Sequence, residues 1–176
     1  GEPILIHPGY TGSLDPWWAL ITPRLKDRFR CIVMDCRGAA DSEHTADGYS
    51  IEQYARDVIG MADHLGLDTF TYCGHSMGGV IGMELGINYA SRLKRLILVA
   101  PAPADGVQSP REVHERSRAL YQAKDRDTMI RERVLMSARE GHDDRIAESV
   151  DRALSVSAGH FDDSWTALVD SRRGAQ

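Results

Sequence analysis

The sequence has little cysteine, no excess of positive charge and no long apolar run, and each absence excludes a class of protein. Its three cysteines cannot all pair with one another, and none has a C-x-x-C or metal-ligand spacing. This favours a reducing, cytoplasmic compartment. The formal net charge of −5 provides no basic surface for phosphates, so we expect no nucleic-acid or membrane partner. No stretch resembles an apolar span of about eighteen residues or a signal peptide.

The N-terminal part of the chain alternates short apolar runs with helix signals. None of the runs alternates clearly with polar residues, which favours strands covered on both faces, as in parallel sheets. A proline after Asp15 and a capping box at Ser50–Gln53 begin two helix-like stretches. This alternation predicts an α/β fold with a doubly wound, mostly parallel sheet. Its four visible strands are expected at residues 4–6, 31–34, 70–73 and 96–99.

The pattern changes after Pro101, where charged amphipathic stretches replace the apolar runs. They predict a helical layer added to the sheet. We therefore divide the chain into a core over 1–104 and a helical cap, or lid, over 105–176. The expected cap helices are 110–123, 127–139, 143–155 and 162–172.

One motif carries chemistry: Gly74-His75-Ser76-Met77-Gly78 fits G-x-S-x-G. It joins an apolar run to a helix-like stretch, which is where a nucleophile elbow exposes its serine above a sheet. Gly74 and Gly78 fit this turn because a Cβ at either position would block the approach of helix and strand. No lysine follows the turn as in a P-loop, and the dinucleotide-binding glycine spacing is absent. The plain alternative is a glycine-rich turn with an idle serine.

Three motifs, in order over about residues 3–103, resemble those of the α/β-hydrolase superfamily. His7–Ser13 resembles its His-Gly oxyanion loop, and Asp35–Ser42 resembles its D-x-R-G-x-G-x-S loop. Gly74–Gly79 matches the G-H-S-M-G-G elbow common among its esterases. The resemblance implies the α/β-hydrolase core with a cap inserted after the fourth strand.

The sequence departs from these motifs at two positions. Pro8 intrudes into the oxyanion loop, which leaves the identity of its donor open. Ala40 stands where the second loop usually has a glycine, which predicts a turn made differently.

The resemblance implies acyl transfer through a covalent intermediate. The Ser76 hydroxyl attacks a carbonyl, and the backbone N–H groups of Met77 and Tyr10 form the oxyanion hole. We expect no metal and no cofactor. The side chain of His75 is expected to point into the scaffold, and His7 to shape the oxyanion loop.

The family places its acid and then its histidine after the serine. Asp105, just past the fourth strand, is a candidate acid, and His160, in a Gly-His-Phe sequence that looks like the family's histidine loop, is a candidate base. The competing interpretation, which we prefer, makes 159–161 a loop between cap helices. The usual acid follows a later strand that this chain does not contain.

Several large side chains are candidates for binding an apolar acyl substrate. For most of the candidates in the cap, the alternative is that their side chains pack the cap helices against one another. The candidates are Tyr10, Trp17, Met129, Met136 and Trp165.

The sequence therefore predicts a serine hydrolase that cleaves a carboxylic ester, lactone or related acyl bond of a small molecule. The alternatives are a carbon–carbon bond hydrolase or acyltransferase on the same fold, and a ligand-binding relative without turnover. Substrate identity and oligomeric state are not indicated. Set against its motifs, the chain of 176 residues is short. We hypothesise a central segment of a longer hydrolase, with the acid and histidine outside 1–176.

Overall fold

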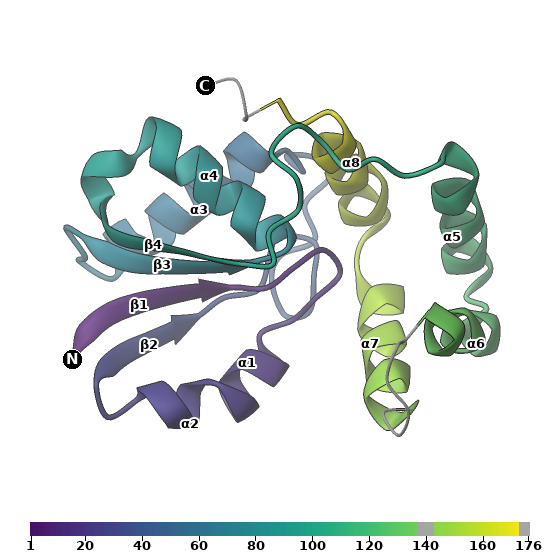
Figure 1. Cartoon of the computed structure of the whole chain (residues 1–176), viewed down its shortest axis with the longest axis horizontal. Coiled ribbons are helices and arrows are strands. Elements are labelled where there is room, and N and C mark those ends of the chain that lie inside the picture. The colour runs from purple at the N-terminus through teal and green to yellow at the C-terminus, as the bar shows by residue number, and fades with distance from the viewer. Residues whose placement is uncertain (137–142, 173–176) are drawn as a thin grey trace.

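A parallel sheet of four strands forms the centre of the protein, as the apolar runs predict (Figure 1). The computed structural model describes residues 1–136 and 143–172. The strands pair in the order β2-β1-β3-β4. Their bounds are β1 (Glu2–His7), β2 (Phe29–Val33), β3 (Phe70–His75) and β4 (Leu93–Val99).

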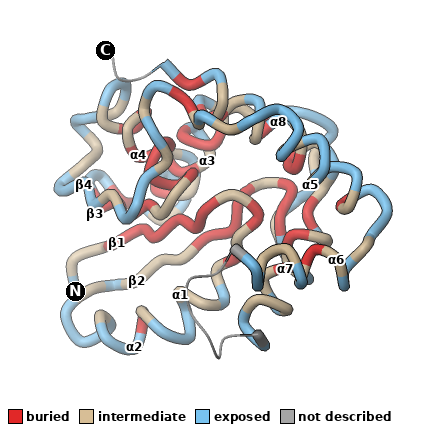
Figure 2. Tube along the Cα trace, turned by 45° about the vertical axis from the view of Figure 1, so that its right-hand side comes forward, coloured by how far each residue is buried: buried red, intermediate tan, exposed pale blue. Residues whose placement is uncertain are grey.

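Helices cover both faces of the sheet. Figure 1 shows α3 (Ile51–His64) and α4 (Met77–Asn88) over one face, and α1 (Asp15–Leu20) and α2 (Thr22–Leu25) over the other. The side chains of β1 alternate between the two layers: Leu5 joins the cluster under α3 and α4, whereas Ile4 and Ile6 pack with Trp17 and Leu25. The buried segments of the core accordingly gather in β1 and β3 and in α3 and α4, and others lie in the cap helices (Figure 2).

The expectation that every strand is covered on both faces is wrong for β4. Leu96, Ile97 and Val99 are 38–40% exposed. Among the described residues, β4 pairs only with β3, and its helix contacts are made mainly by α4. An apolar run thus marks this strand correctly but does not reveal how many layers cover it.

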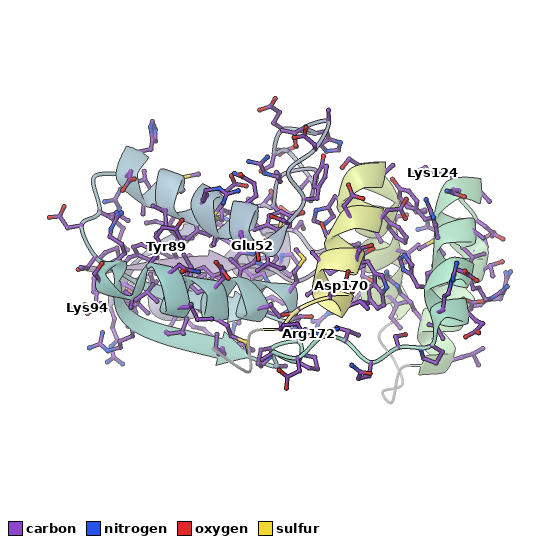
Figure 3. The ribbon with its side chains drawn as sticks, turned by 90° about the horizontal axis from the view of Figure 1, so that it is seen from above. Glu52, Tyr89, Lys94, Lys124, Asp170 and Arg172 are labelled. Atoms are coloured by element: carbon purple, nitrogen blue, oxygen red, sulfur yellow. The ribbon has the colours of Figure 1, made fainter. Side chains whose placement is uncertain are left out.

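Four further helices form the predicted layer beyond the core. Figure 1 shows α5, α6 and α7 past the carboxyl ends of the strands, with α8 beside them. Seen from above, α3 and α4 lie side by side, and α8, which ends near Asp170, lies between them and α5, which ends near Lys124 (Figure 3). The bounds are α5 (Arg111–Ala123), α6 (Arg126–Met136), α7 (Asp143–Ser155) and α8 (Ala158–Val169).

The start of α8 corrects the sequence prediction. The expected loop at 159–161 is the first turn of this helix. The Ser157 hydroxyl accepts a hydrogen bond from the His160 N–H at 3.1 Å, which is an N-cap. Asp162, the expected first residue of this helix, and Asp163 lie inside it.

Helix α8 also contributes to the core. Phe161 and Leu168 are buried in the same cluster as Tyr54 of α3 and Met77 of α4. The division of the chain at residue 104 stays a prediction, because this buried cluster extends across it. In the described part of the chain, every helix is too short or too polar to span a membrane.

Candidate active site

Ser76 lies at a sharp turn between β3 and α4. Its φ of 53° and ψ of −112° are unusual for a residue with a side chain. Its N–H donates to the Val99 carbonyl at 3.1 Å, and its carbonyl accepts from the Gly79 N–H at 2.9 Å. The hydroxyl does not cap the helix that it precedes. The backbone is thus fixed while the hydroxyl stays available, as a nucleophile elbow requires.

Two glycines let the backbone approach this turn closely, as predicted from the motif. A Cβ at Gly74 would overlap the carbonyl oxygen of Gly78. A Cβ at Gly78 would lie 2.6 Å from the carbonyl oxygen of Pro8 and 2.7 Å from that of His7. The elbow therefore packs directly against the loop after β1.

That loop passes beside the serine. A Cβ built on Gly9 would lie 3.0 Å from the Cβ of Ser76. The loop turns back at once, because the Gly12 N–H donates to the Gly9 carbonyl at 2.9 Å. On the other side of Ser76, Met77 is the first residue of α4, so its N–H has no intrahelical acceptor and lies at the positive end of the helix.

The Tyr10 side chain leaves the loop toward α8. Its hydroxyl donates to the Phe161 carbonyl, and its ring stacks on His160 with the centroids 5.9 Å apart. This side chain anchors the loop to the cap.

Buried polar groups support the loops around Ser76. His7 is fully buried, with Nδ1 3.1 Å from the Pro8 carbonyl and Nε2 3.6 Å from the Cys36 sulfur. Burial lowers the pKa of His7 to about 4, so the ring is neutral at pH 7. Asp35 accepts the Leu14 N–H at 2.7 Å and joins the loops after β1 and β2, and burial raises its pKa.

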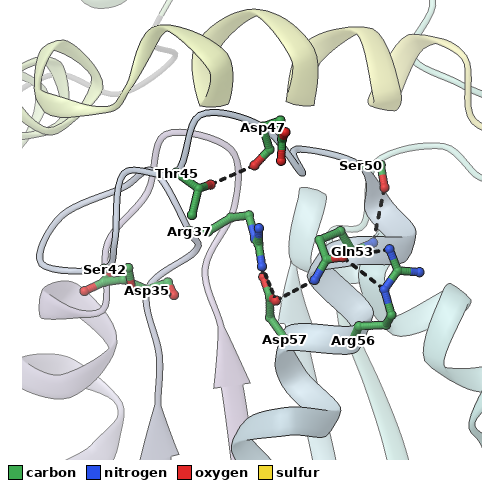
Figure 4. A network of polar contacts seen from close by, with 9 residues as sticks. All are labelled: Asp35, Arg37, Ser42, Thr45, Asp47, Ser50, Gln53, Arg56 and Asp57. Atoms are coloured by element: carbon green, nitrogen blue, oxygen red, sulfur yellow. Dashed lines mark hydrogen bonds and ion pairs between the residues drawn. The ribbon is translucent and has the colours of Figure 1, made fainter.

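A second polar network fixes the loop after β2 on helix α3 (Figure 4). Arg37 Nε and Nη2 donate to the two carboxylate oxygens of Asp57 at 2.6 and 2.5 Å. Gln53 Nε2 donates to the same carboxylate at 2.9 Å. In this loop Ala40 has a φ of 46°, the region that glycine favours. The prediction that this turn is made differently is therefore wrong, because alanine adopts the left-handed backbone.

A cavity of about 400 Å³ adjoins the elbow. His75, next to Ser76 in sequence, forms part of its wall, and its ring contacts Trp17 with the centroids 5.7 Å apart. The ring thus packs on α1, and the expectation that the His75 side chain points into the scaffold stays a prediction. The remaining wall comes from the oxyanion loop, from α1 and the turn after it, and from two cap helices: residues 8–13, Pro16, Leu20, Ile21, Arg133, Ser149 and Arg152.

The predicted substrate-binding residues are divided by the structure. Tyr10 and Trp17 line this cavity. Met129 is buried with Val150 and Ala153 between α6 and α7, and it also lines a smaller cavity of about 120 Å³. Trp165 stacks on His114 with the centroids 4.9 Å apart, joining α8 to α5. The side chain of Met136 lies outside the described residues.

Among the described residues, neither the candidate acid nor the candidate base forms a hydrogen bond with the Ser76 side chain. Asp105 is exposed, and its carbonyl accepts from Arg172 of the segment after α8 at 3.2 Å. His160 is buried: Nδ1 lies 2.8 Å from the Tyr54 hydroxyl and 3.1 Å from the Arg37 carbonyl, and Nε2 has no hydrogen-bond partner. Among the described residues, no group forms a hydrogen bond with the Ser76 hydroxyl. The roles of Asp105 and His160 stay predictions.

The two cap arginines in the cavity wall were not predicted from the sequence. Arg133 and Arg152 occur in charged helices among many similar residues, so no local signal separates them from surface side chains. No group of three or more His, Cys, Asp or Glu residues within the described ranges could hold a metal ion.

Comparison with known proteins places this geometry in a family. Residues 2–154 match the family described as alpha/beta hydrolase fold. Haloalkane dehalogenase 2 of Mycobacterium bovis is 36% identical over 103 residues, which cover 56% of this chain and 34% of that protein. The 3-oxoadipate enol-lactonase 2 of Acinetobacter baylyi is 33% identical over 105 residues, covering 60% of this chain and 39% of that protein. The matches thus span two fifths or less of these relatives.

Solved structures with the same arrangement extend over nearly the whole chain. The enol-lactonase of Burkholderia xenovorans superposes with a TM-score of 0.81 at 26% identity, over 97% of this chain and 66% of that protein. An esterase of Exiguobacterium antarcticum superposes with a TM-score of 0.81 at 24% identity, over 99% of this chain and 68% of that protein, and this likeness concerns the fold.

Proposed function

Because the chain belongs to the α/β-hydrolase fold family, we propose that it is a serine hydrolase that cleaves a carboxylic ester, lactone or related acyl bond of a small molecule. The observation that carries this proposal is the backbone of Ser76. A positive φ at a non-glycine residue, between a strand and a glycine-rich helix, is the conformation that exposes a nucleophilic hydroxyl.

The surroundings of Ser76 support the acyl-transfer chemistry. The Ser76 oxygen adds to the substrate carbonyl, and the negative charge that develops on the carbonyl oxygen is stabilised by the N–H groups of Met77 and Tyr10. Expulsion of the alcohol or ring oxygen leaves an acyl-enzyme, which water then hydrolyses to the free acid and serine. We assign no residue to proton transfer, since neither Asp105 nor His160 contacts Ser76.

The names of the relatives support the substrate class only in part. The Acinetobacter and Burkholderia proteins are named for enol-lactone cleavage, whereas the Mycobacterium protein is named for haloalkane dehalogenation. We favour an acyl substrate because the residue at the elbow is serine. A cytoplasmic location remains a prediction from the cysteine pattern.

Covalent labelling at Ser76 tests the proposal. We expect a fluorophosphonate probe to label the wild-type chain at Ser76, and a chromogenic short-chain ester to be hydrolysed. Ser76→Ala should remove both signals, whereas Ser91→Ala, at an exposed position before β4, should retain them.

Each alternative function has its own outcome. Labelling without turnover favours a ligand-binding relative, and turnover only with an added acyl acceptor favours an acyltransferase. Hydrolysis of a β-diketone but not of esters favours carbon–carbon cleavage. Ester hydrolysis that survives in Ser76→Ala would overturn the serine mechanism.

A further inference from the structure

We propose that the acyl substrate carries a carboxylate, and that Arg133 of α6 and Arg152 of α7 bind it in the cavity beside Ser76. This inference rests on the proposed function and specifies the substrate class for the same site. Both arginines line the cavity of about 400 Å³, and its described wall contains no aspartate or glutamate. The cavity is therefore positively charged at the cap.

Among the described residues, Arg133 has no carboxylate partner, unlike three other cap arginines. Arg116 pairs with Glu132 at 2.5 Å, Arg118 with Asp162 at 2.9 Å, and Arg126 with Asp151 at 2.6 Å. Among the described residues, Arg133 instead donates from Nη1 to the Ser149 hydroxyl at 2.7 Å. A neutral oxygen orients the guanidinium but leaves its charge without a counterion.

Burial makes this lack of a counterion costly. Arg133 is half-buried, and burial lowers the pKa of its guanidinium; the positive charge of Arg152 lowers it further. A guanidinium nonetheless keeps its proton under ordinary conditions. An anion in the cavity would therefore relieve both the desolvation and the repulsion between the two arginines.

A bound anion would meet only weak competition for Arg152 from a carboxylate of the protein. Its one ion pair among the described residues is with Glu148, one turn earlier on α7, at 3.8 Å. The Glu148 side chain is 68% exposed, so water screens the pair and the contact is easily exchanged. Arg152 can therefore turn to a ligand without leaving a buried carboxylate behind.

The rest of the wall suits a short carbon chain that ends in a carboxylate. Trp17, Leu20 and Ile21 provide apolar surface in the same cavity wall. Guanidinium groups bind planar carboxylates through paired hydrogen bonds. The carbon chain of the acyl group thus remains apolar, as predicted from the sequence, and only its far end carries a charge.

Two esters that differ only at the far end of the acyl chain test the proposal. These are the mono-p-nitrophenyl ester of glutaric acid and p-nitrophenyl pentanoate, which share the chain length and the leaving group. We expect a higher kcat/KM for the glutarate ester, through a lower KM. Arg133→Gln should reduce the ratio of the two kcat/KM values roughly tenfold or more, as loss of a charged hydrogen bond predicts. Arg152→Gln should act in the same direction.

Arg131→Gln is the matched control, because it removes the same charge from α6 at an exposed position that bonds only to Thr128 among the described residues. It should leave the ratio unchanged. An equal ratio in all four proteins, or a wild-type preference for pentanoate, would overturn the carboxylate assignment while leaving the hydrolase proposal intact.

Binding measured without turnover separates the two proposals. Glutarate is titrated calorimetrically into Ser76→Ala, with and without Arg133→Gln. Binding that is lost in the double variant supports the carboxylate site even if the wild type hydrolyses neither ester. Absence of glutarate binding, or binding that does not depend on Arg133, counts against the site whatever the esters show.

Discussion

The Tyr54 hydroxyl lies 2.8 Å from Nδ1 of His160, and this contact joins helix α3 to helix α8. The same hydroxyl lies 2.6 Å from the Ser164 hydroxyl, one turn further along α8. The Arg37 carbonyl also faces Nδ1, at 3.1 Å, whereas Nε2 has no partner. His160 thus holds the cap to the core as a neutral ring.

We expect the protein to lose stability on mild acidification. Burial lowers the pKa of His160 and of His7 to about 4, below the value near 6.5 expected in the unfolded chain. The unfolded state therefore binds more protons between these values. The free energy of unfolding should be greatest above pH 6.5 and should fall toward pH 4 by about 1.4 kcal/mol per pH unit for each histidine.

Urea unfolding at a series of pH values measures this dependence. His160→Gln should reduce the slope by the share of one histidine, and His64→Gln, at an exposed position of α3, is the matched control. A slope that is the same in His160→Gln and in the wild type would contradict the neutral buried ring.

Replacing Gly78 by alanine should disrupt the elbow. The new Cβ would meet the carbonyl oxygens of Pro8 and His7, and neither backbone atom can move aside without shifting β1. We expect a loss of about 3 kcal/mol or more in the free energy of unfolding, at the upper end of overpacking effects.

Gly60→Ala provides the contrast. It lies inside α3 with no atom within 4 Å of the added Cβ, so the substitution should stabilise the chain by about 0.5–1 kcal/mol. Thermal and urea unfolding measure both changes. Similar effects of the two substitutions would show that the close approach at Gly78 is unimportant.

The ion pair between Arg37 and Asp57 should contribute measurably to stability. The two side chains are only 21% and 22% exposed and are joined by two hydrogen bonds. Asp57→Asn should therefore cost about 1–2 kcal/mol, below the effect of a fully buried pair because of partial screening.

The pair between Arg111 and Glu115 on α5 is a suitable comparison, with side chains 87% and 55% exposed. Glu115→Gln should change the free energy of unfolding by no more than about 0.5 kcal/mol. A large effect at Glu115 with none at Asp57 would contradict the importance of burial.

The sequence predicts most of the core, because apolar runs and helix caps of a few residues mark its strands and helices. Each apolar run becomes a strand, and the capping box at Ser50 begins α3 where expected, with its hydroxyl accepting the Gln53 N–H. The start of α8 is missed because two N-cap signals, Ser157 and Asp162, compete. The helix begins at the earlier one, where the Ser157 hydroxyl accepts the His160 N–H and Phe161 packs into the core.

The site is predictable where its geometry depends on neighbours in sequence. Ser76 is found from five consecutive residues, since the strained turn and its glycines are local. Arg133 and Arg152 are not found, because their place in the cavity wall depends on how α6 and α7 pack, which no local pattern shows. The exposure of β4 is missed for a similar reason: an apolar run does not say how many layers cover it.

The left-handed backbone of Ser76 has a consequence for laboratory evolution. Such a conformation costs a non-glycine residue about 1–3 kcal/mol, whereas glycine adopts it freely. A library selected only for thermal tolerance would therefore enrich glycine at this position, gaining robustness while losing the nucleophile. Each round of such a selection needs a screen for turnover, because heat resistance favours glycine at position 76 whereas catalysis requires serine.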